Sequence, residues 1–336
     1  MTTTTPYQAA DGSFVRPDSE FRQTISSEPG ARYPPVKGRY ALYFAPGCPW
    51  AHRTLIVRKL KGLDDIVDLY QLHSYMGPEG WYFSGEGGSL PKDPLYGFTK
   101  LKELYLKANP NYTGRYTVPV LWDKKTGTLV NNESSEIIRI LASAFDSLLP
   151  EARREANQPG GGLYPAAQRA EIDALNDWVY ATVNNGVYKI GFATAQAAYD
   201  EHVPALFASL DRLEAQLAAH GKHFLLGDAL TEADVRLYTT LVRFDSAYAA
   251  VFLCTLRSIR HDYPHLHLWL RRLYWDGAAV RDQTRGAFHA TTAPYIGHYI
   301  EGYARSRHKV VFKEQGPLII PTGPAQLIEP LPKGED

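Results

Sequence analysis

A short apolar run that leads into a proline-led helix is the feature that most constrains how this chain folds. Residues 39–45, RYALYFA, are apolar and rich in aromatic side chains, which is typical of a buried strand. Pro49 then stands where a helix would begin, a position at which its missing N–H costs nothing. Apolar residues recur at helical spacing until Gly62, which ends the pattern. The stretch predicts a strand that passes directly into a helix, with Cys48 at the junction.

The segments that follow continue this alternation. Residues 66–72 predict a second strand, 117–123 and 127–132 a hairpin, and 134–145 a helix. Between the second strand and the hairpin lies a long insert that contains Trp and several Tyr. Loops of this length are either functional or disordered, and the aromatic residues favour an ordered, functional segment. The order of strand, helix, strand, insert, hairpin and helix resembles a thioredoxin-like α/β domain.

The 336 residues are enough for about two domains, each with its own core. Residues 148–165 contain Pro, Gly and charge but no apolar stripe, so they predict a linker. Helical patterns dominate from 166 to about 305. We therefore expect an arm over 1–36, the thioredoxin-like domain over 37–147, an all-α domain over 166–305, and a Pro-rich tail over 306–336.

The overall composition excludes several classes of function. Lys plus Arg and Asp plus Glu each number 36, so no excess of positive charge favours nucleic acid or an acidic membrane surface. The polar start MTTTTPYQAADGSF does not resemble a signal peptide, and no apolar run reaches the ~20 residues of a membrane helix. Two cysteines cannot form a disulfide framework. We expect a cytoplasmic protein that binds neither nucleic acid nor membranes.

The position of Cys48 predicts a reactive thiol. A cysteine just before a helix meets unpaired backbone N–H groups and the positive end of the helix dipole, and both favour the thiolate. Most cysteines are buried structural residues, and Cys254, inside AAVFLCTL, fits that description. Ala51 stands where the second thiol of a C-x-x-C motif would be, so a mixed disulfide on Cys48 must await an outside thiol. This pattern indicates a monothiol enzyme served by a small thiol such as glutathione.

Two features further along the chain predict a binding site for this small thiol. Pro119, in TVPV, precedes a strand, where a cis bond would offer neighbouring backbone groups to a peptide ligand. Glu133 and Ser134 lie where the chain turns into the next helix, where Ser and the helix N-terminus favour a carboxylate and Glu an ammonium group. Taken alone, the Glu133–Ser134 pair is explained by helix capping, but its combination with Cys48 and Pro119 is more specific.

Several longer motifs resemble a known family. CPWAHR, the GW in the insert, YTGRYTVPVLWDKKTGTLVNNESSEIIRIL, LNDWVYATVNNGVYKIGFA and LTEADVRLYTTLVRFD are similar to the glutathionyl-hydroquinone reductases, the Xi class of glutathione transferases. The resemblance covers residues 40–305, and IIPTGP echoes the tail of that family. It implies the glutathione transferase fold, a homodimer, and removal of glutathione from a hydroquinone conjugate through a mixed disulfide.

The resemblance also implies roles for individual residues. It makes Cys48 the nucleophile, Tyr188 a proton donor or acceptor, and Tyr248 and Tyr299 tyrosines beside the thiol. Near Tyr299 the sequence departs from the family pattern, so Tyr295 or Tyr303 could fill that role instead. The implied glutathione-binding residues are Trp81, Arg115, Tyr116, Thr117, Val118, Glu133 and Ser134.

Other parts of the sequence have simpler explanations. Thr231 and Asp234 form a capping-box pattern, so Asp234 is expected to serve folding. HDYPHLH places His261 and His265 four residues apart, but the stretch lacks cysteine and we expect no metal site. Rival functions are an omega-like thiol transferase acting on dehydroascorbate or protein mixed disulfides, a conjugating transferase, and a non-enzymatic glutathione-binding module.

Overall fold

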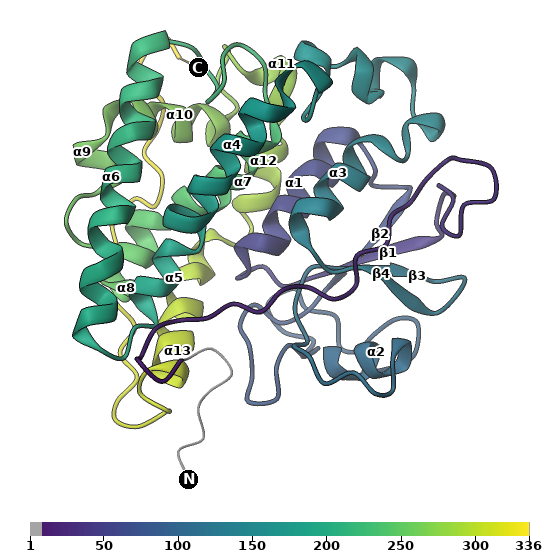
Figure 1. Cartoon of the computed structure of the whole chain (residues 1–336), viewed down its shortest axis with the longest axis horizontal. Coiled ribbons are helices and arrows are strands. Elements are labelled where there is room, and N and C mark those ends of the chain that lie inside the picture. The colour runs from purple at the N-terminus through teal and green to yellow at the C-terminus, as the bar shows by residue number, and fades with distance from the viewer. Residues whose placement is uncertain (1–8, 336) are drawn as a thin grey trace. The chain divides into compact units, whose positions relative to one another are not determined.

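The computed structural model describes residues 9–335. The chain divides into two compact units, shown in Figure 1. One unit, Asp18–Leu163, contains the sheet and is called the sheet unit below. The other, called the helical unit, combines Met1–Pro17 with Tyr164–Asp336. The residues predicted as one N-terminal arm are thus shared between the two units.

The sheet unit is built on four strands in the order β2-β1-β3-β4. β1 pairs parallel with β2 and antiparallel with β3, and β3 pairs antiparallel with β4. Figure 1 shows α1 and α3 on one face of the sheet and α2 on the other. This is the thioredoxin-like arrangement that the sequence predicted. The elements are β1 (Tyr40–Phe44), α1 (Pro49–Lys61), β2 (Val67–Gln71), α2 (Leu101–Ala108), β3 (Val120–Asp123), β4 (Thr128–Asn131) and α3 (Ser134–Ser143).

The central strand explains the apolar run in the sequence. Every residue of β1 is buried, because helices cover both faces of the sheet. α1 begins at Pro49 and ends at Lys61, and it is capped by Gly62, whose φ of 69° is the left-handed conformation that glycine adopts without strain. Arg58, Lys59 and Lys61 lie in its last turn, where positive charge opposes the negative end of the helix dipole.

The long insert between β2 and α2 is ordered around one buried carboxylate. Asp93 accepts a hydrogen bond from the hydroxyl of Tyr43 in β1 at 2.6 Å. Its other oxygen accepts from the N–H groups of Leu95 and Tyr96 at 3.1 and 2.6 Å. The insert is therefore tied to the central strand rather than loosely attached to it.

The stretch after α3 consists of short 3-10 turns fixed by a buried lysine. Lys61 Nζ lies 3.1 Å from Asp146 and 3.0 Å from Glu155. Glu155 also accepts a hydrogen bond from the N–H of Leu163 at 2.6 Å. Pairing offsets the cost of burying the lysine charge. The turns are Asp146–Leu148, Glu151–Arg153, Glu155–Asn157 and Pro159–Gly161, followed in the helical unit by Ala166–Gln168.

Part of the N-terminal segment lies along the outer edge of β4. The N–H of Gln23 donates to the carbonyl of Val130 at 2.9 Å, and the N–H of Asn132 donates to the carbonyl of Phe21 at 3.0 Å. Arg22 forms an antiparallel bridge with Asn131 and a salt bridge with Glu136. These residues form no strand of their own but occupy hydrogen-bonding groups that the edge of the sheet would otherwise leave open.

The helical unit contains ten α-helices and two π-helical turns among its described residues. None of these helices is both long and apolar enough to span a bilayer. The helices are α4 (Arg169–Val179), α5 (Gly186–Gly191), α6 (Gln196–His220), α7 (Glu232–Leu241), α8 (Ala249–Phe252), α9 (Ile259–Asp262), α10 (Pro264–Trp275), α11 (Arg281–Thr284), α12 (Ala287–Thr292) and α13 (Tyr299–Val310), with π-helical turns at Tyr180–Asn184 and Phe244–Tyr248 and a 3-10 turn at Ile296–His298.

The predicted capping box at the start of α7 is confirmed. Asp234 accepts hydrogen bonds from the N–H and hydroxyl of Thr231, both at 3.1 Å. The other oxygen of Asp234 accepts from the N–H of Leu225 at 2.9 Å and the indole N–H of Trp269 at 3.0 Å. Asp234 is fully buried and serves the packing of the helical unit, as predicted.

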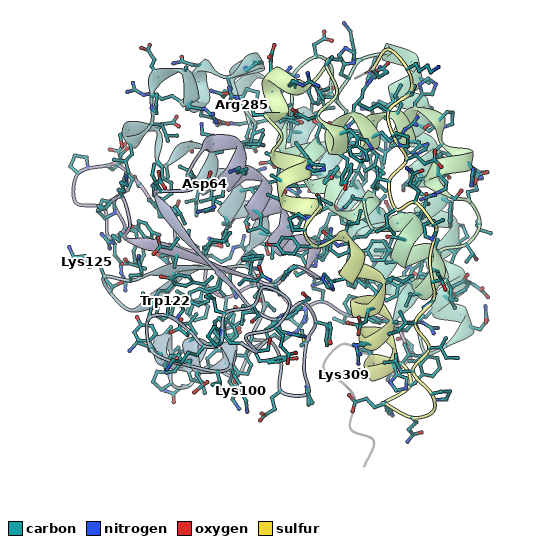
Figure 2. The ribbon with its side chains drawn as sticks, turned by 180° about the vertical axis from the view of Figure 1, so that it is seen from behind. Asp64, Lys100, Trp122, Lys125, Arg285 and Lys309 are labelled. Carbon is teal, nitrogen blue, oxygen red and sulfur yellow. The ribbon has the colours of Figure 1, made fainter. Side chains whose placement is uncertain are left out.

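The C-terminal tail packs along α10. Arg272 forms a two-point salt bridge with Glu335, at 2.7 and 2.6 Å, and the indole N–H of Trp275 donates to the carbonyl of Glu329 at 2.7 Å. The last helix, α13, extends past residue 305 to Val310, and Lys309 in its last turn is labelled in Figure 2. A salt bridge between Glu301 and Arg305, one turn apart, lies within this helix.

Candidate functional site

The thiol of Cys48 lies at the start of α1. Cys48 is the N-cap residue, with an extended backbone (φ −82°, ψ 117°), and the first turn of the helix contains no acidic residue. The positive end of the helix dipole is therefore not neutralised by a nearby carboxylate on α1. Cys48 is buried but keeps 9% of its surface exposed, whereas Cys254 keeps none. The local structure is the one that the sequence predicted for a reactive cysteine.

The backbone before β3 faces this thiol. Cys48 Sγ lies 3.5 Å from the carbonyl oxygen of Val118, to which the thiol donates. The Val118–Pro119 peptide bond is cis, as the sequence suggested. Val118, one of the predicted glutathione-binding residues, is thus placed in direct contact with the thiol. The segment before it is held by Tyr105, whose hydroxyl donates to the carbonyl of Thr117 at 2.8 Å.

Glu133 and Ser134 begin the helix that packs beside α1. Glu133 is the N-cap of α3, and its Oε1 accepts hydrogen bonds from the N–H and hydroxyl of Ser135 at 3.1 and 2.9 Å. Its Oε2 accepts from the hydroxyl of Ser19 at 3.1 Å. The structure therefore shows the capping role for Glu133. Its expected role in glutathione binding is kept as a proposal.

A buried arginine connects the two helix starts. Arg53, on α1, is 1% exposed, and its guanidinium carbon lies 4.4 Å from the ring centroid of Trp50. Its Nη1 lies 3.4 Å from the hydroxyl of Ser134. This places a positive charge beside the N-terminus of α3. Arg53 was not predicted as a site residue, although it is the last residue of the CPWAHR motif.

The other predicted glutathione-binding residues lie on the insert and the segment before β3. Trp81 is 9% exposed, and its carbonyl accepts from the N–H of Leu101 at 2.9 Å. The carbonyl of Arg115 accepts from the hydroxyl of Tyr112 at 3.0 Å and the N–H of Thr117 at 3.1 Å. Tyr116 packs edge-on against Tyr105. Their backbones are thus fixed within the sheet unit.

A second group of candidate residues lies in the helical unit. The hydroxyl oxygen of Tyr303 is 3.0 Å from that of Tyr188 and 2.8 Å from that of Tyr248. These three residues are called the tyrosine cluster below. Tyr188 lies on α5 and Tyr303 on α13, while Tyr248 ends a π-helical turn. Turns of this kind are rare and occur often at functional sites.

Tyr299, the tyrosine chosen from the family pattern, lies apart from this cluster. Its hydroxyl has no hydrogen-bond partner among the described residues. Its ring packs on Arg243, whose guanidinium carbon is 3.8 Å from the ring centroid. Tyr303 is one helical turn further along α13, on the same side of the helix. Tyr303, an alternative raised by the sequence, is therefore the residue of α13 whose hydroxyl joins those of Tyr188 and Tyr248, while the tyrosine that lies beside the thiol stays a prediction. Tyr295 is a half-buried residue before α13.

Burial keeps the hydroxyl groups of Tyr248 and Tyr303 protonated. It raises the pKa of Tyr248 and of Tyr303 well above the ordinary value, while the positive charge of Arg243 opposes this effect. Burial also raises the pKa of Tyr299 to about 12. At neutral pH, Tyr248 and Tyr303 are therefore hydrogen-bonding phenols rather than phenolates. Arg243 itself is fully buried, with Nη1 donating to the carbonyl of Thr239 at 2.7 Å.

Cys254, by contrast, has the properties of a structural cysteine. It is fully buried, and burial raises the pKa of its thiol. Cys48 and Cys254 are not joined by a disulfide bond. Among residues 9–335, no group of three or more His, Cys, Asp or Glu side chains is arranged to hold a metal ion.

Comparisons with known proteins agree with this geometry. The glutathione S-transferase N-terminal domain model matches residues 47–144, and the C-terminal domain model matches residues 196–272. "Glutathione S-transferase omega-like 2" of Schizosaccharomyces pombe is 50% identical over 280 residues, covering 83% of this chain and 88% of that protein. "Glutathionyl-hydroquinone reductase PcpF" of Sphingobium chlorophenolicum is 44% identical over 328 residues, covering 97% and 93%.

A solved structure gives the same result for the fold. The crystal structure of the Xi glutathione transferase ECM4 from Saccharomyces cerevisiae, in complex with glutathione, superimposes with a TM-score of 0.85. It is 38% identical and covers 96% of this chain and 100% of that chain. The chain is therefore an enzyme that binds glutathione, and it belongs to the glutathione transferase family, in the Xi class that includes the glutathionyl-hydroquinone reductases.

Proposed function

We propose that this enzyme uses glutathione to reduce glutathionyl-hydroquinones to free hydroquinones, through a mixed disulfide between Cys48 and glutathione. The observation that carries the proposal is the position of Cys48 at the N-cap of α1, in contact with the Val118 carbonyl and with Ala51 in place of a second thiol. The name of the PcpF relative supports the choice of substrate.

The first step exchanges a carbon–sulfur bond for a sulfur–sulfur bond. The Cys48 thiolate attacks the sulfur that joins glutathione to the ring, the bond from sulfur to ring carbon breaks, and the ring carbon takes up a proton. The ring is thereby reduced, and the two sulfur atoms are oxidised to a disulfide. A second glutathione thiolate then attacks the glutathione sulfur, which releases oxidised glutathione and restores the Cys48 thiolate. In total, one conjugate and one glutathione give one hydroquinone and one oxidised glutathione.

The tyrosine cluster suits the proton transfer. We assign the role of proton donor to Tyr188, as the family resemblance implies, with its hydroxyl hydrogen-bonded to that of Tyr303. The hydroxyl of Tyr248 is also hydrogen-bonded to that of Tyr303. A proton lost by Tyr188 can therefore be replaced along this chain of three hydroxyls. In this proposal Tyr303 is the third catalytic tyrosine, a role that the family pattern assigned to Tyr299.

For glutathione, we propose a binding site on the sheet unit. Val118 offers its carbonyl beside the thiol, and the N-terminus of α3 with Ser134 offers partners for the carboxylate of the γ-glutamyl group. Arg53, beside Ser134, adds positive charge for the same carboxylate. The remaining predicted binding residues, Trp81, Arg115, Tyr116, Thr117 and Glu133, complete this proposal.

The direct test is turnover of a glutathionyl-hydroquinone in the presence of glutathione. Free hydroquinone and oxidised glutathione are measured by chromatography for the wild type, Cys48→Ser and, as the matched control, Cys254→Ser. We expect equal amounts of the two products, loss of both in Cys48→Ser, and normal turnover in Cys254→Ser. Undiminished turnover in Cys48→Ser would refute the mechanism.

An omega-like thiol transferase is the second candidate, favoured by the name of the S. pombe relative. It would use the same mixed disulfide but reduce dehydroascorbate or protein mixed disulfides. Turnover of dehydroascorbate without release of hydroquinone would establish this alternative. The homodimer and the cytoplasmic location implied by the sequence analysis stay predictions, and sedimentation of the purified chain would test the first.

A further inference from the structure

The segment Asp11–Arg16 is anchored to the helical unit. Asp11 accepts hydrogen bonds from the N–H and hydroxyl of Ser13, which closes a tight turn. The carbonyl of Gly12 accepts from the N–H of Thr194 at 3.1 Å. Gly12 has a φ of +83°, and a Cβ at this position would lie 2.9 Å from the Cβ of Ala195. Only glycine fits this turn, which brings the segment against the chain that follows α5.

From this anchor, two side chains reach Tyr188. Phe14 is 5% exposed, and its ring stacks on that of Tyr188 with centroids 6.1 Å apart. It also packs against Phe192, 5.5 Å away. The guanidinium carbon of Arg16 lies 5.1 Å from the ring centroid of Tyr188. A cation at this distance interacts with the negative face of an aromatic ring.

Arg16 also holds the backbone that positions Tyr188. Its Nε donates to the side-chain oxygen of Asn185 at 3.0 Å. Asn185 is the N-cap of α5, but its side chain caps no backbone N–H of that helix. Its carbonyl accepts the N–H of Tyr188 at 3.1 Å. The side-chain oxygen of an asparagine at an N-cap usually accepts a hydrogen bond from the backbone of its own helix. The side-chain oxygen of Asn185 accepts one from Arg16 instead.

We infer that Arg16 is a positioning residue for Tyr188, acting through the Asn185 side chain and through its positive charge over the Tyr188 ring. The inference rests on the proposed function, in which Tyr188 donates the proton. A cation over the ring stabilises the phenolate that remains after donation, and the bond to Asn185 fixes the start of α5. Nothing in the family motifs used above extends to this segment of the chain.

Other groups also face Tyr188 or act on it electrostatically. Tyr303 bonds its hydroxyl, and Tyr248 packs beside its ring. Arg243 lies within electrostatic range of all three residues of the tyrosine cluster. Arg16 differs from these groups because it comes from the N-terminal segment, far away in the sequence. Its charge can therefore be removed while all three tyrosine hydroxyls of the cluster are kept.

The test compares Arg16→Gln, which removes the charge, with Arg16→Lys, which keeps it. The matched control is Arg32→Gln, because Arg32 lies over the ring of Tyr33 at the same 5.1 Å but in the sheet unit. We expect Arg16→Gln to lower kcat roughly threefold to thirtyfold, the range of one cation–ring interaction, with little change in KM for glutathione. We also expect the alkaline limb of its pH–rate profile to move to higher pH, because the phenol then loses its proton less readily. Arg16→Lys should retain most of the rate and the wild-type profile.

A second readout does not depend on turnover. Hydrogen exchange of the backbone amides of α5 should be faster in Arg16→Gln than in the wild type or Arg32→Gln. The inference is overturned if the pH–rate profile and the α5 amide exchange of Arg16→Gln match those of the wild type. It is also overturned if kcat falls as far in Arg16→Lys as in Arg16→Gln. If the wild type itself released no hydroquinone, the proposed function would fail, while the exchange of α5 would still decide whether Arg16 positions this helix.

Discussion

The hydroxyl oxygen of Tyr303 lies 2.8 Å from that of Tyr248, deep inside the helical unit. The same oxygen is 3.0 Å from that of Tyr188, so one residue of α13 links two tyrosines that come from separate parts of the chain. Each phenol has one proton to donate, and the three hydroxyls therefore form a directional chain of hydrogen bonds. The tyrosine cluster depends on Tyr303 because Tyr303 is bonded to both other members.

We predict that Tyr303→Phe lowers hydroquinone release by roughly a hundredfold, because it removes the hydroxyl that supports the proton donor. Steady-state rates with a glutathionyl-hydroquinone measure this effect. Tyr299→Phe is the control, since its hydroxyl has no partner among the described residues and its ring packing on Arg243 would be retained. We expect this variant to keep its activity and its stability. A larger loss in Tyr299→Phe than in Tyr303→Phe would restore Tyr299 to the site.

A close approach of two backbone segments constrains the residue before the thiol. A Cβ on Gly47 would lie 2.3 Å from the carbonyl oxygen of Ser74. We predict that Gly47→Ala displaces the start of α1 and reduces the rate at which Cys48 reacts with an alkylating reagent, together with turnover. Gly297→Ala is the control, because nothing lies within 4 Å of a Cβ there. Equal reactivity of Cys48 in both variants would contradict the prediction.

The buried pair Arg39–Asp123 predicts a pH dependence of stability. Nε and Nη2 of Arg39 donate to the two carboxylate oxygens of Asp123 at 2.7 and 2.6 Å. Burial alone would raise the pKa of Asp123, but the hydrogen bonds from Arg39 and Thr126 outweigh it and lower the pKa below its ordinary value. Since the folded-state pKa lies below the unfolded one, the pair stabilises the fold above about pH 4 and this stability is lost as the pH falls.

We therefore expect Asp123→Asn to lower the free energy of unfolding by roughly 3 kcal/mol at neutral pH, because it leaves a buried arginine without its counter-charge. Urea unfolding at a series of pH values measures the difference from the wild type. The difference should shrink as the pH falls below about 4. A difference that stays constant down to acid pH would show that the charge of Asp123 contributes nothing.

The two cysteines should differ sharply in reactivity. Cys48 lies at a helix start and is 9% exposed, whereas Cys254 is fully buried, which raises the pKa of its thiol. We predict that iodoacetamide labels one cysteine per folded chain, Cys48, and that glutathione disulfide slows the labelling by occupying the same thiol. Mass spectrometry of tryptic peptides identifies the site. Labelling of Cys254 at a comparable rate would contradict the burial seen in the structure.

Much of the sheet unit was predictable from local sequence signals. The run before Cys48, the proline after it and Gly62 define a strand and a helix whose bounds the structure confirms to within a residue. These signals are local, since they concern backbone donors, helix ends and burial over a few residues. β3 was predicted to begin at residue 117 but begins at Val120. The difference arises because Pro119 has no N–H to donate to a neighbouring strand.

The tyrosine cluster was only partly predictable. Tyr188 and Tyr248 belong to quoted motifs, but Tyr299 and Tyr303 lie one turn apart on the same helix, and sequence alone cannot tell which hydroxyl meets the others. The contacts of Arg16 with Asn185 and Tyr188 join residues more than 160 positions apart. Pairings over such distances follow from the packing of the whole unit, and no local pattern indicates them.

The segment beside β4 also determines how the protein can safely be shortened. Gln23 and Phe21 use the outward-facing backbone groups of Val130 and Asn132. A version of the chain starting after residue 25 would present this flank to solvent as a template for another molecule, and such flanks promote self-association. Residues 21–23 thus protect this edge of the sheet against self-association, and a truncated form is expected to elute from a sizing column as large aggregates.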